Sequence, residues 1–271
     1  MFERTGMPRL AAAATAVLVS FSGGARAQFT QGEFTAYNPA NASTIQPGLT
    51  SLYSIPVDSL IPTQINVGDA ETTAKANAFN LIANAAALNA DLLGEVEPVV
   101  IGPNGQLYQT DGHHTFVGLE QSIYGASNPN VYVQVIANYS NLTPAAFAAA
   151  MAANTQLYPF ANGVPQPVTQ AGSNLISPIP TSLAGLTNDP YRGLEYSVLK
   201  NAGAGGVGHD KTAGYSDFMW ADAYRTASGT AGGSGLAVSY THLAPGVGPR
   251  CRSPASDKPT CAPPPRHKRS R

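Results

Sequence analysis

The amino-acid sequence predicts a domain that combines strands and helices in one folding unit. Residues 131–136 place a valine at every second position, which is the side-chain period of a β-strand. The pair Asn104-Gly105 separates two short apolar runs, and Asn-Gly in this setting favours a hairpin turn. Residues 74–90 instead carry apolar side chains three and four positions apart, which is the spacing of an amphipathic helix.

The N-terminal half of the domain is expected to pass from an irregular lead-in to strands and helices. Residues 28–52 are rich in Asn, Ser, Thr, Gly and Pro, and they predict mostly irregular structure before a strand at 53–56. The helix at 74–90 follows, with Phe79, Ile82 and Ala86 along one stripe. The hairpin pairs residues 99–101 with 106–110, and a helix at 113–124 comes next with Phe116, Leu119 and Ile123 on one face.

The C-terminal half is expected to be mainly helical. After the strand at 131–136, Thr143 and Pro144 begin a helix that runs to about residue 154, because Pro suits the first helical position. Residues 158–184 are rich in Pro, Gly and Asn and predict a long loop. The remaining expected features are a helix capped by Asn188 or Asp189, a glycine-rich loop at 203–208, and a last helix capped by Ser216 or Asp217 that ends near residue 226.

Residues 1–27 are typical of a secretory signal. Arg4 and Arg9 give it a basic start, residues 10–21 are apolar but too few to span a bilayer, and Ala25-Arg26-Ala27 matches a cleavage site. We therefore expect a mature protein that begins near Gln28, is periplasmic or secreted, and has no membrane segment. A membrane anchor is the alternative interpretation.

The composition changes again near residue 237. Residues 245–271 are rich in Pro, Arg, Lys and Ser without apolar periodicity, which predicts disorder. Cys251 and Cys261 lie here and could form a disulfide in an oxidising compartment. Residues 238–243 resemble a translated sequencing adapter, so we hypothesise that the natural chain ends near Leu236.

The segment between these ends, residues 28–236, is acidic. It holds 5 basic and 14 acidic side chains, a formal charge of −9 with histidine neutral. Such a charge repels polyphosphate, and five cations cannot form a broad nucleic-acid patch, so binding of duplex DNA is disfavoured. The segment also has no cysteine, which excludes thiol catalysis and thiolate zinc sites.

The stretch with the most promising chemistry joins the second hairpin strand to the next helix. Asp111-Gly112 suggests a turn, and His113 and His114 follow at the helix start. Helix N-termini gather backbone N–H groups that hold anions, and imidazole transfers protons near neutral pH. Neighbouring side chains at a helix start diverge by roughly 100°, so we expect one imidazole to face a cavity and the other to pack inside.

Several motifs occur in an order that matches a known family. They are Pro62-Thr63-Gln64 with Val67-Gly68, Glu71 and Lys75; Val99-Val100-Ile101-Gly102-Pro103 with Leu107-Tyr108 and Asp111-Gly112-His113-His114; Asn188-Asp189-Pro190-Tyr191-Arg192; and Phe218-Met219-Trp220-Ala221-Asp222. Together they resemble the ParB-like nuclease family, a branch of the ParB and sulfiredoxin fold group, over roughly residues 55–225. The resemblance implies a compact α+β domain with a small mixed sheet and surrounding helices.

The resemblance also implies a phosphate or nucleotide site. In ParB proteins and sulfiredoxins the corresponding strand-to-helix turn holds nucleotide phosphates and has an Arg near its end. In this sequence Gly112 and Thr115 are the matching candidates for substrate binding, and Thr115 stands where that Arg would be. Sulfiredoxin chemistry needs a Cys in this loop, and the sequence has none there.

Three roles are open for the histidines. As catalytic residues, His113 or His114 would act as general acid/base or as nucleophile on phosphorus, with Asp111 orienting the ring. As metal ligands, Asp111 and His113 would hold a divalent ion, Mg²⁺ or Mn²⁺, with Asp222 or Asp217 beside them. In the structural interpretation, the turn and the histidine pair only shape the helix start.

Lys75 and Arg192 are candidate substrate-binding residues because basic side chains are scarce between residues 28 and 236. Arg192 stands at a predicted helix start, where it would hold a phosphate or pair with an acid such as Asp222. Lys75 would bind substrate or lie on a solvated helix face. Gln64 reaches the site if the first motif folds back over it.

Two functions are compatible with these features. The first is an exported nuclease or phosphoester hydrolase centred on the two histidines, with a small phosphorylated molecule or nucleotide as a more suitable substrate than duplex DNA. The second is a non-catalytic module on the same fold that binds a small ligand or nucleotide. The need for a divalent metal and the oligomeric state are left open by the sequence.

Overall fold

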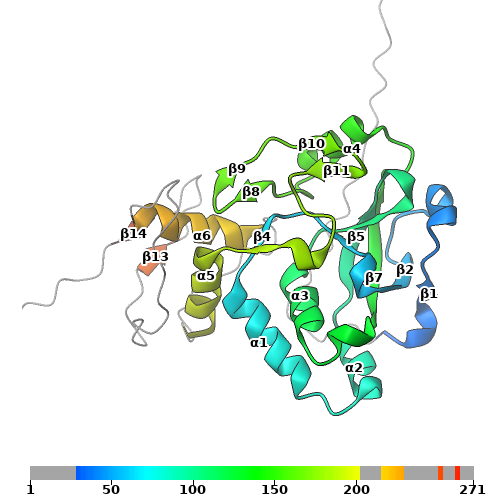
Figure 1. Ribbon diagram of the computed structural model, residues 1–271, viewed down its shortest axis with the longest axis horizontal. Coiled ribbons are helices and arrows are strands. Elements are labelled where there is room, and N and C mark those ends of the chain that lie inside the picture. The colour runs from blue at the N-terminus through cyan, green and yellow to red at the C-terminus, as the bar shows by residue number, and fades with distance from the viewer. Residues whose placement is uncertain (1–28, 202–214, 229–249, 253–259, 263–271) are drawn as a thin grey trace, which may run out of the picture.

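A six-stranded mixed sheet forms the centre of the fold, in the order β1-β2-β7-β5-β6-β3 (Figure 1). In this order the strands are Thr35–Ala36, Leu52–Pro56, Asn130–Asn138, Glu97–Ile101, Leu107–Gln109 and Ile61–Pro62. The pairs β2–β7 and β5–β6 are antiparallel, and β1–β2, β5–β7 and β3–β6 are parallel. The computed structural model describes residues 29–201, 215–228, 250–252 and 260–262. The small mixed sheet and the α+β class predicted from the sequence are confirmed.

The expected hairpin and the central strand owe their form to local sequence signals. Asn104 and Gly105 both have positive φ, 69° and 72°, in the turn that joins β5 to β6. On β7, Val131, Val133 and Val135 are fully buried, and the intervening Tyr132 and Gln134 are buried too. Both faces of this strand are therefore covered. Valines lie on one face, and larger side chains with polar groups lie on the other, which is also buried.

Helices and a hairpin layer cover the two faces of the sheet. The helices are α1 Asp69–Asn80, α2 Ala85–Leu92, α3 His113–Gln121, α4 Pro144–Ala153, α5 Pro190–Asn201 and α6 Ser216–Ala227. Side chains of α1, α2 and α3 share one hydrophobic cluster with Val99 and Ile101 of β5. The intervening Val100 belongs to the second cluster, with Phe147 and Met151 of α4. The period of two along β5 thus distributes its side chains between two cores.

The predicted helix at 74–90 is two helices, which corrects the sequence interpretation. Helix α1 begins earlier, at Asp69, and ends at Asn80, while α2 starts at Ala85 after Asn84, whose side chain accepts a hydrogen bond from the Ala87 backbone. Leu81 in the break is 87% exposed. An asparagine cap in the middle of the expected stripe competes with helix continuation, and the alanine-rich stripe is too weakly apolar to override it.

The helix predicted at 113–124 ends at Gln121, three residues early. Phe116 and Leu119 are buried as expected, but Ile123 is 67% exposed and its backbone N–H donates to the side chain of Asn80. The expected cap of the last helix is also wrong, because α6 is preceded by Tyr215 in a left-handed conformation and has no side-chain cap. The caps Thr143 of α4 and Asp189 of α5 are confirmed.

Residues 158–184 are not one long loop. They contain the pairs β8 Phe160–Ala161 with β9 Val164–Pro165, and β10 Thr169–Ala171 with β11 Asn174–Ser177. Asn162 and Gly163 make the first turn with positive φ at both residues, so this is a second Asn-Gly hairpin that the proline content concealed. Leu175 and Ile176 of β11 are buried against α4.

The remaining elements are short. Strand β4 Asn66–Val67 pairs in parallel with β12 Thr187–Asn188, and β13 Arg250–Arg252 pairs antiparallel with β14 Thr260–Ala262 inside the segment expected to be disordered. The 3-10 helices are η1 Gln31–Glu33, η2 Pro39–Thr44, η3 Val57–Ser59, η4 Pro103–Gly105, η5 Gly125–Ser127 and η6 Leu183–Gly185. The predicted signal, the glycine-rich loop 203–208 and most of the tail lie outside the described residues, so those expectations stay predictions. Within the described ranges, no helix has the length and apolar character needed to cross a bilayer.

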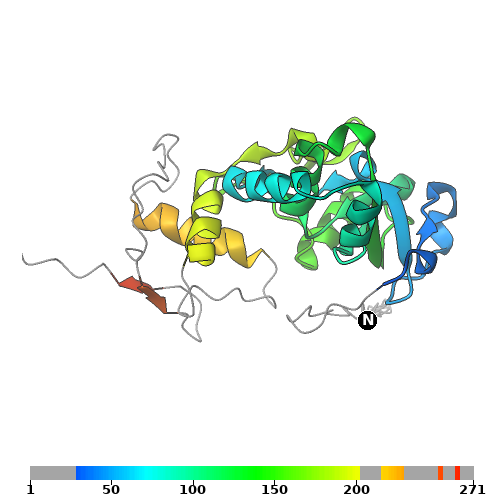
Figure 2. The ribbon, with the colours of Figure 1, turned by 90° about the horizontal axis from the view of Figure 1, so that it is seen from below.

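Helices α1, α5 and α6 come together at one end of the molecule, away from β1 and β2 at the other (Figures 1 and 2). The approach of α1 to α5 is close because Gly68, which precedes α1, lies on the backbone of Gly193 in α5. A Cβ atom at Gly68 would stand 2.6 Å from the backbone nitrogen of Gly193 and 2.9 Å from the carbonyl carbon of Arg192. The φ of Gly68 is −98°, so the constraint is steric.

We predict that Gly68→Ala lowers the free energy of unfolding by about 1–3 kcal/mol, because the added methyl group must push two backbones apart. The matched control is Gly32→Ala, since a Cβ atom at Gly32 meets nothing within 4 Å. That variant should change stability by less than about 0.5 kcal/mol. Urea unfolding of the two variants and the parent measures both effects, and equal losses would contradict the steric argument.

Candidate functional site

The two adjacent histidines bind backbone N–H groups of the segment between β3 and α1. The backbone N–H of Thr63 donates to Nε2 of His113 (3.1 Å), and the backbone N–H of Gly68 donates to Nε2 of His114 (3.0 Å). His113 is 2% exposed and His114 is 8% exposed. The pair therefore fastens residues 63–68 to the first turn of α3.

His113 is a neutral, internal side chain. Burial lowers its pKa to about 3, although a hydrogen bond to the backbone of Gln109 opposes this shift. With one ring nitrogen accepting from Thr63 and the ring also bonded to Gln109, no ring nitrogen is left for a substrate or a metal ion. This geometry opposes the catalytic and metal-binding roles expected for His113 and supports the structural role.

His114 differs from His113 in facing ionisable groups. Burial lowers its pKa well below the usual value, and the nearby positive charge of Arg192 lowers it further. The ring is therefore neutral, and because Nε2 accepts a hydrogen bond, its proton resides on Nδ1. Nδ1 lies 3.8 Å from Oε2 of Glu71, too far for a direct hydrogen bond and without the charge that an ion pair needs. His114 thus orients an N–H toward the Glu71 carboxyl group.

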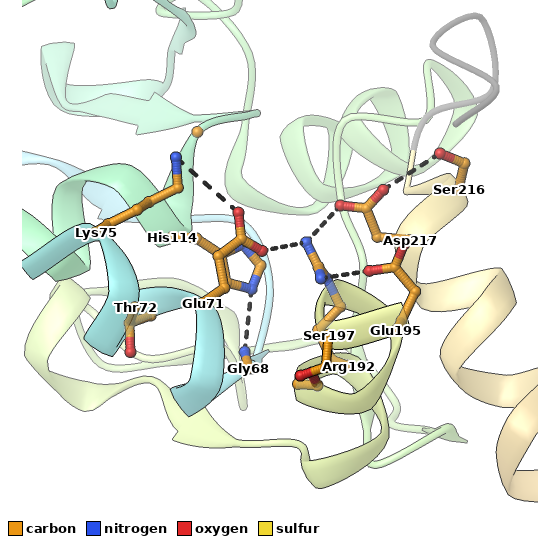
Figure 3. Close-up of polar contacts among 12 residues, drawn as sticks. Gly68, Glu71, Thr72, Lys75, His114, Arg192, Glu195, Ser197, Ser216 and Asp217 are labelled. Carbon is orange, nitrogen blue, oxygen red and sulfur yellow. Dashed lines mark hydrogen bonds and ion pairs between the residues drawn. The ribbon is translucent and has the colours of Figure 1, made fainter. Parts of the chain in front are cut away.

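Glu71 belongs to a cluster in which three carboxyl groups surround one guanidinium group (Figure 3). Nη2 of Arg192 contacts Oε2 of Glu71 at 2.7 Å and Oδ2 of Asp217 at 2.5 Å, and Nη1 contacts Oε2 of Glu195 at 2.6 Å. Glu71 lies on α1, Arg192 and Glu195 on α5, and Asp217 on α6. Arg192 is almost completely buried, so these contacts are little screened by water.

The start of α5 is built to place Arg192. Asp189 accepts hydrogen bonds from the backbone N–H groups of Tyr191 and Arg192 through Oδ1, which caps the helix. Its Oδ2 contacts Nη2 of Arg225 on α6 at 2.6 Å, and Arg225 also pairs with Asp222. One aspartate therefore sets both the first turn of α5 and the position of α6.

A cavity of about 330 Å³ opens beside the Arg192 cluster. Nζ of Lys75, one helical turn after Glu71 on α1, lies 4.0 Å from Oε1 of Glu71 at its rim. The lining residues include Glu71, Lys75, Arg192, Glu195, Tyr196 and Asp217. We call this cavity the Glu71 pocket.

The carboxyl group of Glu71 has a raised pKa. Burial raises its pKa above the usual value, and the charges of Arg192 and Lys75, which act in the opposite direction, do not cancel the effect. The same carboxyl groups raise the pKa of Arg192, which stays charged. A buried carboxylic acid with a raised pKa in a cavity is a candidate proton donor.

Comparison with known proteins identifies the family of this domain. The family model described as "Putative ParB-like nuclease" matches residues 53–226. The chain belongs to this family. A similar solved structure is the crystal structure of protein Atu1540 from Agrobacterium tumefaciens, at 28% identity, with 65% of this chain and 79% of that chain covered and a TM-score of 0.49. No curated protein matches the sequence.

In this ParB-like domain, three of the residues expected from the sequence come together. His114, Lys75 and Arg192 all contact or face Glu71. Arg192 does not pair with Asp222 as the sequence suggested, because Asp222 pairs with Arg225 and accepts a hydrogen bond from Tyr158.

Other expected site residues serve the fold of the ParB-like domain. Gln64 is buried and its amide donates to the carbonyl of Asn66, so it does not reach the Glu71 pocket. Asp111 is exposed and accepts from the backbone N–H of Gly112, whose φ of 73° makes it the left-handed turn residue before α3. Thr115 is buried in the first turn of α3. The hydrogen bond and the left-handed conformation of Gly112 give this pair a role in the turn before α3.

The expected metal site is not assembled. Among the residues that the structure describes, no three His, Cys, Asp or Glu side chains are grouped to hold a metal ion. Of the expected set, His113 is bonded to Thr63 and Gln109, Asp222 is bonded to Tyr158 and Arg225, and Asp111 bonds its own turn. In the Glu71 pocket, the three carboxyl groups are held around the guanidinium group of Arg192.

The sequence interpretation gave no role to Glu71, Glu195 or Tyr196. Two spacings contained the signal: Glu71 and Lys75 are four apart and Arg192 and Glu195 three apart, which places each pair on one helix face. These spacings become informative only when these faces of α1 and α5 are known to meet. Their contact depends on the tertiary structure and cannot be deduced from the spacings alone.

The neutral state of the histidines predicts an acid-sensitive fold. Below pH 6.5 the unfolded chain binds protons on these histidines, whereas folded His113 binds one only near pH 3. The free energy of unfolding should therefore fall as the pH drops from 6.5 toward 4.5, by up to about 1.4 kcal/mol per pH unit for each histidine. Glu71 contributes in the opposite direction, because its raised pKa makes the folded state bind a proton more readily than the unfolded state.

The variant His113→Gln isolates one histidine. Glutamine offers an oxygen to the Thr63 N–H but does not titrate, so the variant should lose the slope that belongs to His113 while Glu71 still contributes. Urea unfolding at half-unit pH intervals measures the two slopes. An unchanged slope in the variant would show that His113 does not govern this pH dependence.

Proposed function

We propose that the Glu71 pocket hydrolyses phosphodiester bonds in small nucleotides or short nucleic-acid ends. The observation that carries the proposal is a pair of carboxyl groups held on one nitrogen of Arg192, at the wall of a cavity. Glu71 lies 2.7 Å and Asp217 2.5 Å from that nitrogen, so their two oxygens are close together. Paired carboxyl groups in different environments are suited to separate acid and base roles.

The environments of the two carboxyl groups favour a protonated acid at Glu71 and an ionised base at Asp217. The side chain of Glu71 is 13% exposed and burial raises its pKa, which favours the protonated acid. The side chain of Asp217 is 25% exposed and belongs to the first turn of α6, where the helix dipole favours the ionised form. Glu71 is therefore the proposed proton donor, and Asp217 is the proposed base.

The charges of the pocket suit a singly charged phosphodiester when Glu71 is protonated. Lys75 and Arg192 then balance Asp217 and Glu195, and the pocket is neutral despite the acidic domain around it. Lys75 is 32% exposed at the rim, where its ammonium group can contact a non-bridging phosphate oxygen. The formal charge of −9 between residues 28 and 236 favours a small substrate over duplex DNA.

The reaction follows from these positions. Asp217 takes a proton from a water molecule as the water oxygen bonds to phosphorus, and the bond from phosphorus to the leaving oxygen breaks as Glu71 donates its proton to that oxygen. Lys75 and Arg192 stabilise the charge on the phosphoryl oxygens. His114 is a positioning residue, because its Nδ1–H faces Glu71 while its Nε2 is fixed by Gly68. Mg²⁺ or Mn²⁺ is added in parallel assays. We also propose that the protein is exported, because residues 1–27 are typical of a secretory signal.

A specific observation favours a second function, a binding module without turnover. Arg192 is paired with three carboxyl groups, and both histidines use their Nε2 atoms for backbone N–H groups. Charge pairing of this kind is also typical of a structural charge cluster. Turnover of a phosphodiester distinguishes the enzyme from a module that only gains thermal stability when a nucleotide binds.

We predict that Glu71→Gln lowers kcat for bis-p-nitrophenyl phosphate or a dinucleotide by about 10²–10⁴-fold, because glutamine cannot donate the proton. The matched control, Asp91→Asn, makes the same type of charge change at an exposed position of α2 and should retain full activity. The assay uses the full chain with EDTA, Mg²⁺ or Mn²⁺. Activity retained in Glu71→Gln under every condition would reject Glu71 as the acid.

The pH profile gives an independent test of the assigned roles. Since Glu71 must be protonated, kcat should decline as the pH rises through its raised pKa, which lies above the usual value of 4.5 for this carboxyl group. A rate that rises continuously from pH 4.5 to pH 8 would mean that Glu71 acts as a base or has no role in the reaction.

A further inference from the structure

A second cavity, of about 540 Å³, lies in the N-terminal lead-in beside the sheet edge formed by β1. Its lining comes from residues 35–53, whereas the family match begins at residue 53. The lead-in lies at the opposite end of the molecule from α5 and α6, and therefore from the Glu71 pocket (Figure 2). This cavity is thus separate from the site of the proposed hydrolysis.

The wall of this cavity is polar but carries no charge. Its polar lining includes Thr35, Asn38, Asn41, Gln46 and Thr50, and among the described residues no Asp, Glu, Lys, Arg or His side chain lines it. The Glu71 pocket, by contrast, is lined by five charged side chains. An ionic ligand would find no counter-charge on this wall, which therefore offers phosphates, carboxylates and amines no ionic contact.

Hydrogen bonds from the central strand hold the wall in place. Nδ2 of Asn138 donates to the carbonyls of Ala42 (2.7 Å) and Ile45 (2.8 Å). Farther along the same loop, Gly48 donates its N–H to the carbonyl of Val135 and accepts from the side chain of Gln134. The backbone of the loop is therefore fixed to β7 at two places, and the loop needs little reordering to bind a ligand.

Several polar side chains of the wall have hydrogen-bonding capacity to spare. Within the described residues, no hydrogen bond engages the side-chain amides of Asn41 and Gln46 or the hydroxyl groups of Thr35 and Thr50. Each amide offers both donors and an acceptor, and each hydroxyl offers one donor and two acceptor positions. This mixture matches the hydroxyl groups of a sugar, each of which donates and accepts.

Tyr53 adds an aromatic side chain to the wall. Its ring meets that of Tyr37 edge to face, with centroids 5.6 Å apart at 86°. Tyr37 is itself fixed by a hydrogen bond from its hydroxyl group to the carbonyl of Gly105 (2.6 Å). The ring of Tyr53 is therefore held in one orientation and can pack against the C–H face of a pyranose.

We propose that the cavity between β1, η2 and β2 is a binding site for a neutral saccharide of one or two sugar units. Uncharged amides and hydroxyl groups recognise the sugar hydroxyls, Tyr53 packs against the ring, and the lack of charge excludes sugar phosphates and uronic acids. The volume lies within the range of small-molecule sites. The site is independent of the Glu71 pocket and of its proposed activity.

The test measures binding of maltose, cellobiose and diacetylchitobiose to the full chain by saturation-transfer difference NMR and calorimetry. Glucuronate, glucosamine and inorganic phosphate are the charged comparators. We expect at least one neutral disaccharide to bind with a Kd in the millimolar range or tighter, and the charged compounds to bind more weakly. Asn41→Ala and Thr50→Ala should each weaken binding by roughly five- to tenfold, because each removes a hydrogen bond to the ligand.

Two controls separate this site from the rest of the molecule. Gln121→Ala removes an exposed amide from the end of α3 and should leave saccharide binding unchanged. Glu71→Gln should also leave it unchanged, even where it abolishes phosphodiester hydrolysis. Asn41 and Thr50 are exposed, so their variants should unfold at the parent temperature. Failure of every neutral disaccharide to bind at about 20 mM, binding that both wall variants retain in full, or a preference for the charged comparators would each overturn the proposal.

Discussion

The guanidinium group of Arg192 is the constraint on which the arrangement of the C-terminal helices depends. It binds carboxyl groups from α1, which precedes it by more than a hundred positions along the chain, and from α5 and α6. Removing the positive charge would leave three buried or half-buried carboxyl groups facing one another, and an unpaired buried charge costs several kcal/mol. The cluster therefore has a structural role whatever chemistry it supports. The ion pair between Arg192 and Asp217 holds the first turn of α6 to the rest of the domain.

The same contacts define what the Glu71 pocket can do. Because Arg192 is shared among three acids, its positive charge does not fully stabilise the ionised form of any one of them, and burial raises the pKa of Glu71. The histidines have a complementary role. Their Nε2 atoms accept from the backbone before α1, which places Glu71 in the first turn of that helix and directs the Nδ1–H of His114 toward it. His113 and His114, which had the most promising chemistry in the sequence, thus help to position the site. Glu71 and Asp217 carry the proposed reaction.

The sequence predicted those elements whose ends depend on local chemistry. Thr143-Pro144, Asp189 and the Asn104-Gly105 turn fix their helices and hairpin through contacts within a few residues, so their positions follow from residue type. The break at Asn84 was missed because a capping signal in the middle of an alanine-rich stretch competes with helix periodicity, and only tertiary packing decides between them. The hairpin at Asn162-Gly163 carries the same local signal as the first, but nearby prolines obscured it.

The candidate site could be predicted only in part, for a different reason. The residue types were informative, since Lys75 and Arg192 are two of only five basic residues between positions 28 and 236 and both reach the Glu71 pocket. The sequence does not specify the direction in which a side chain points. A histidine at a helix start can face a cavity or accept a hydrogen bond from a backbone N–H group, and the sequence is the same in both cases. Here the close contact of Gly68 with Gly193 decides the outcome, because it brings α1 against α5 and leaves His114 between the Gly68 N–H and Glu71. Two glycines without functional groups therefore set the approach of α1 to α5, and with it the position of Glu71 in the wall of the pocket.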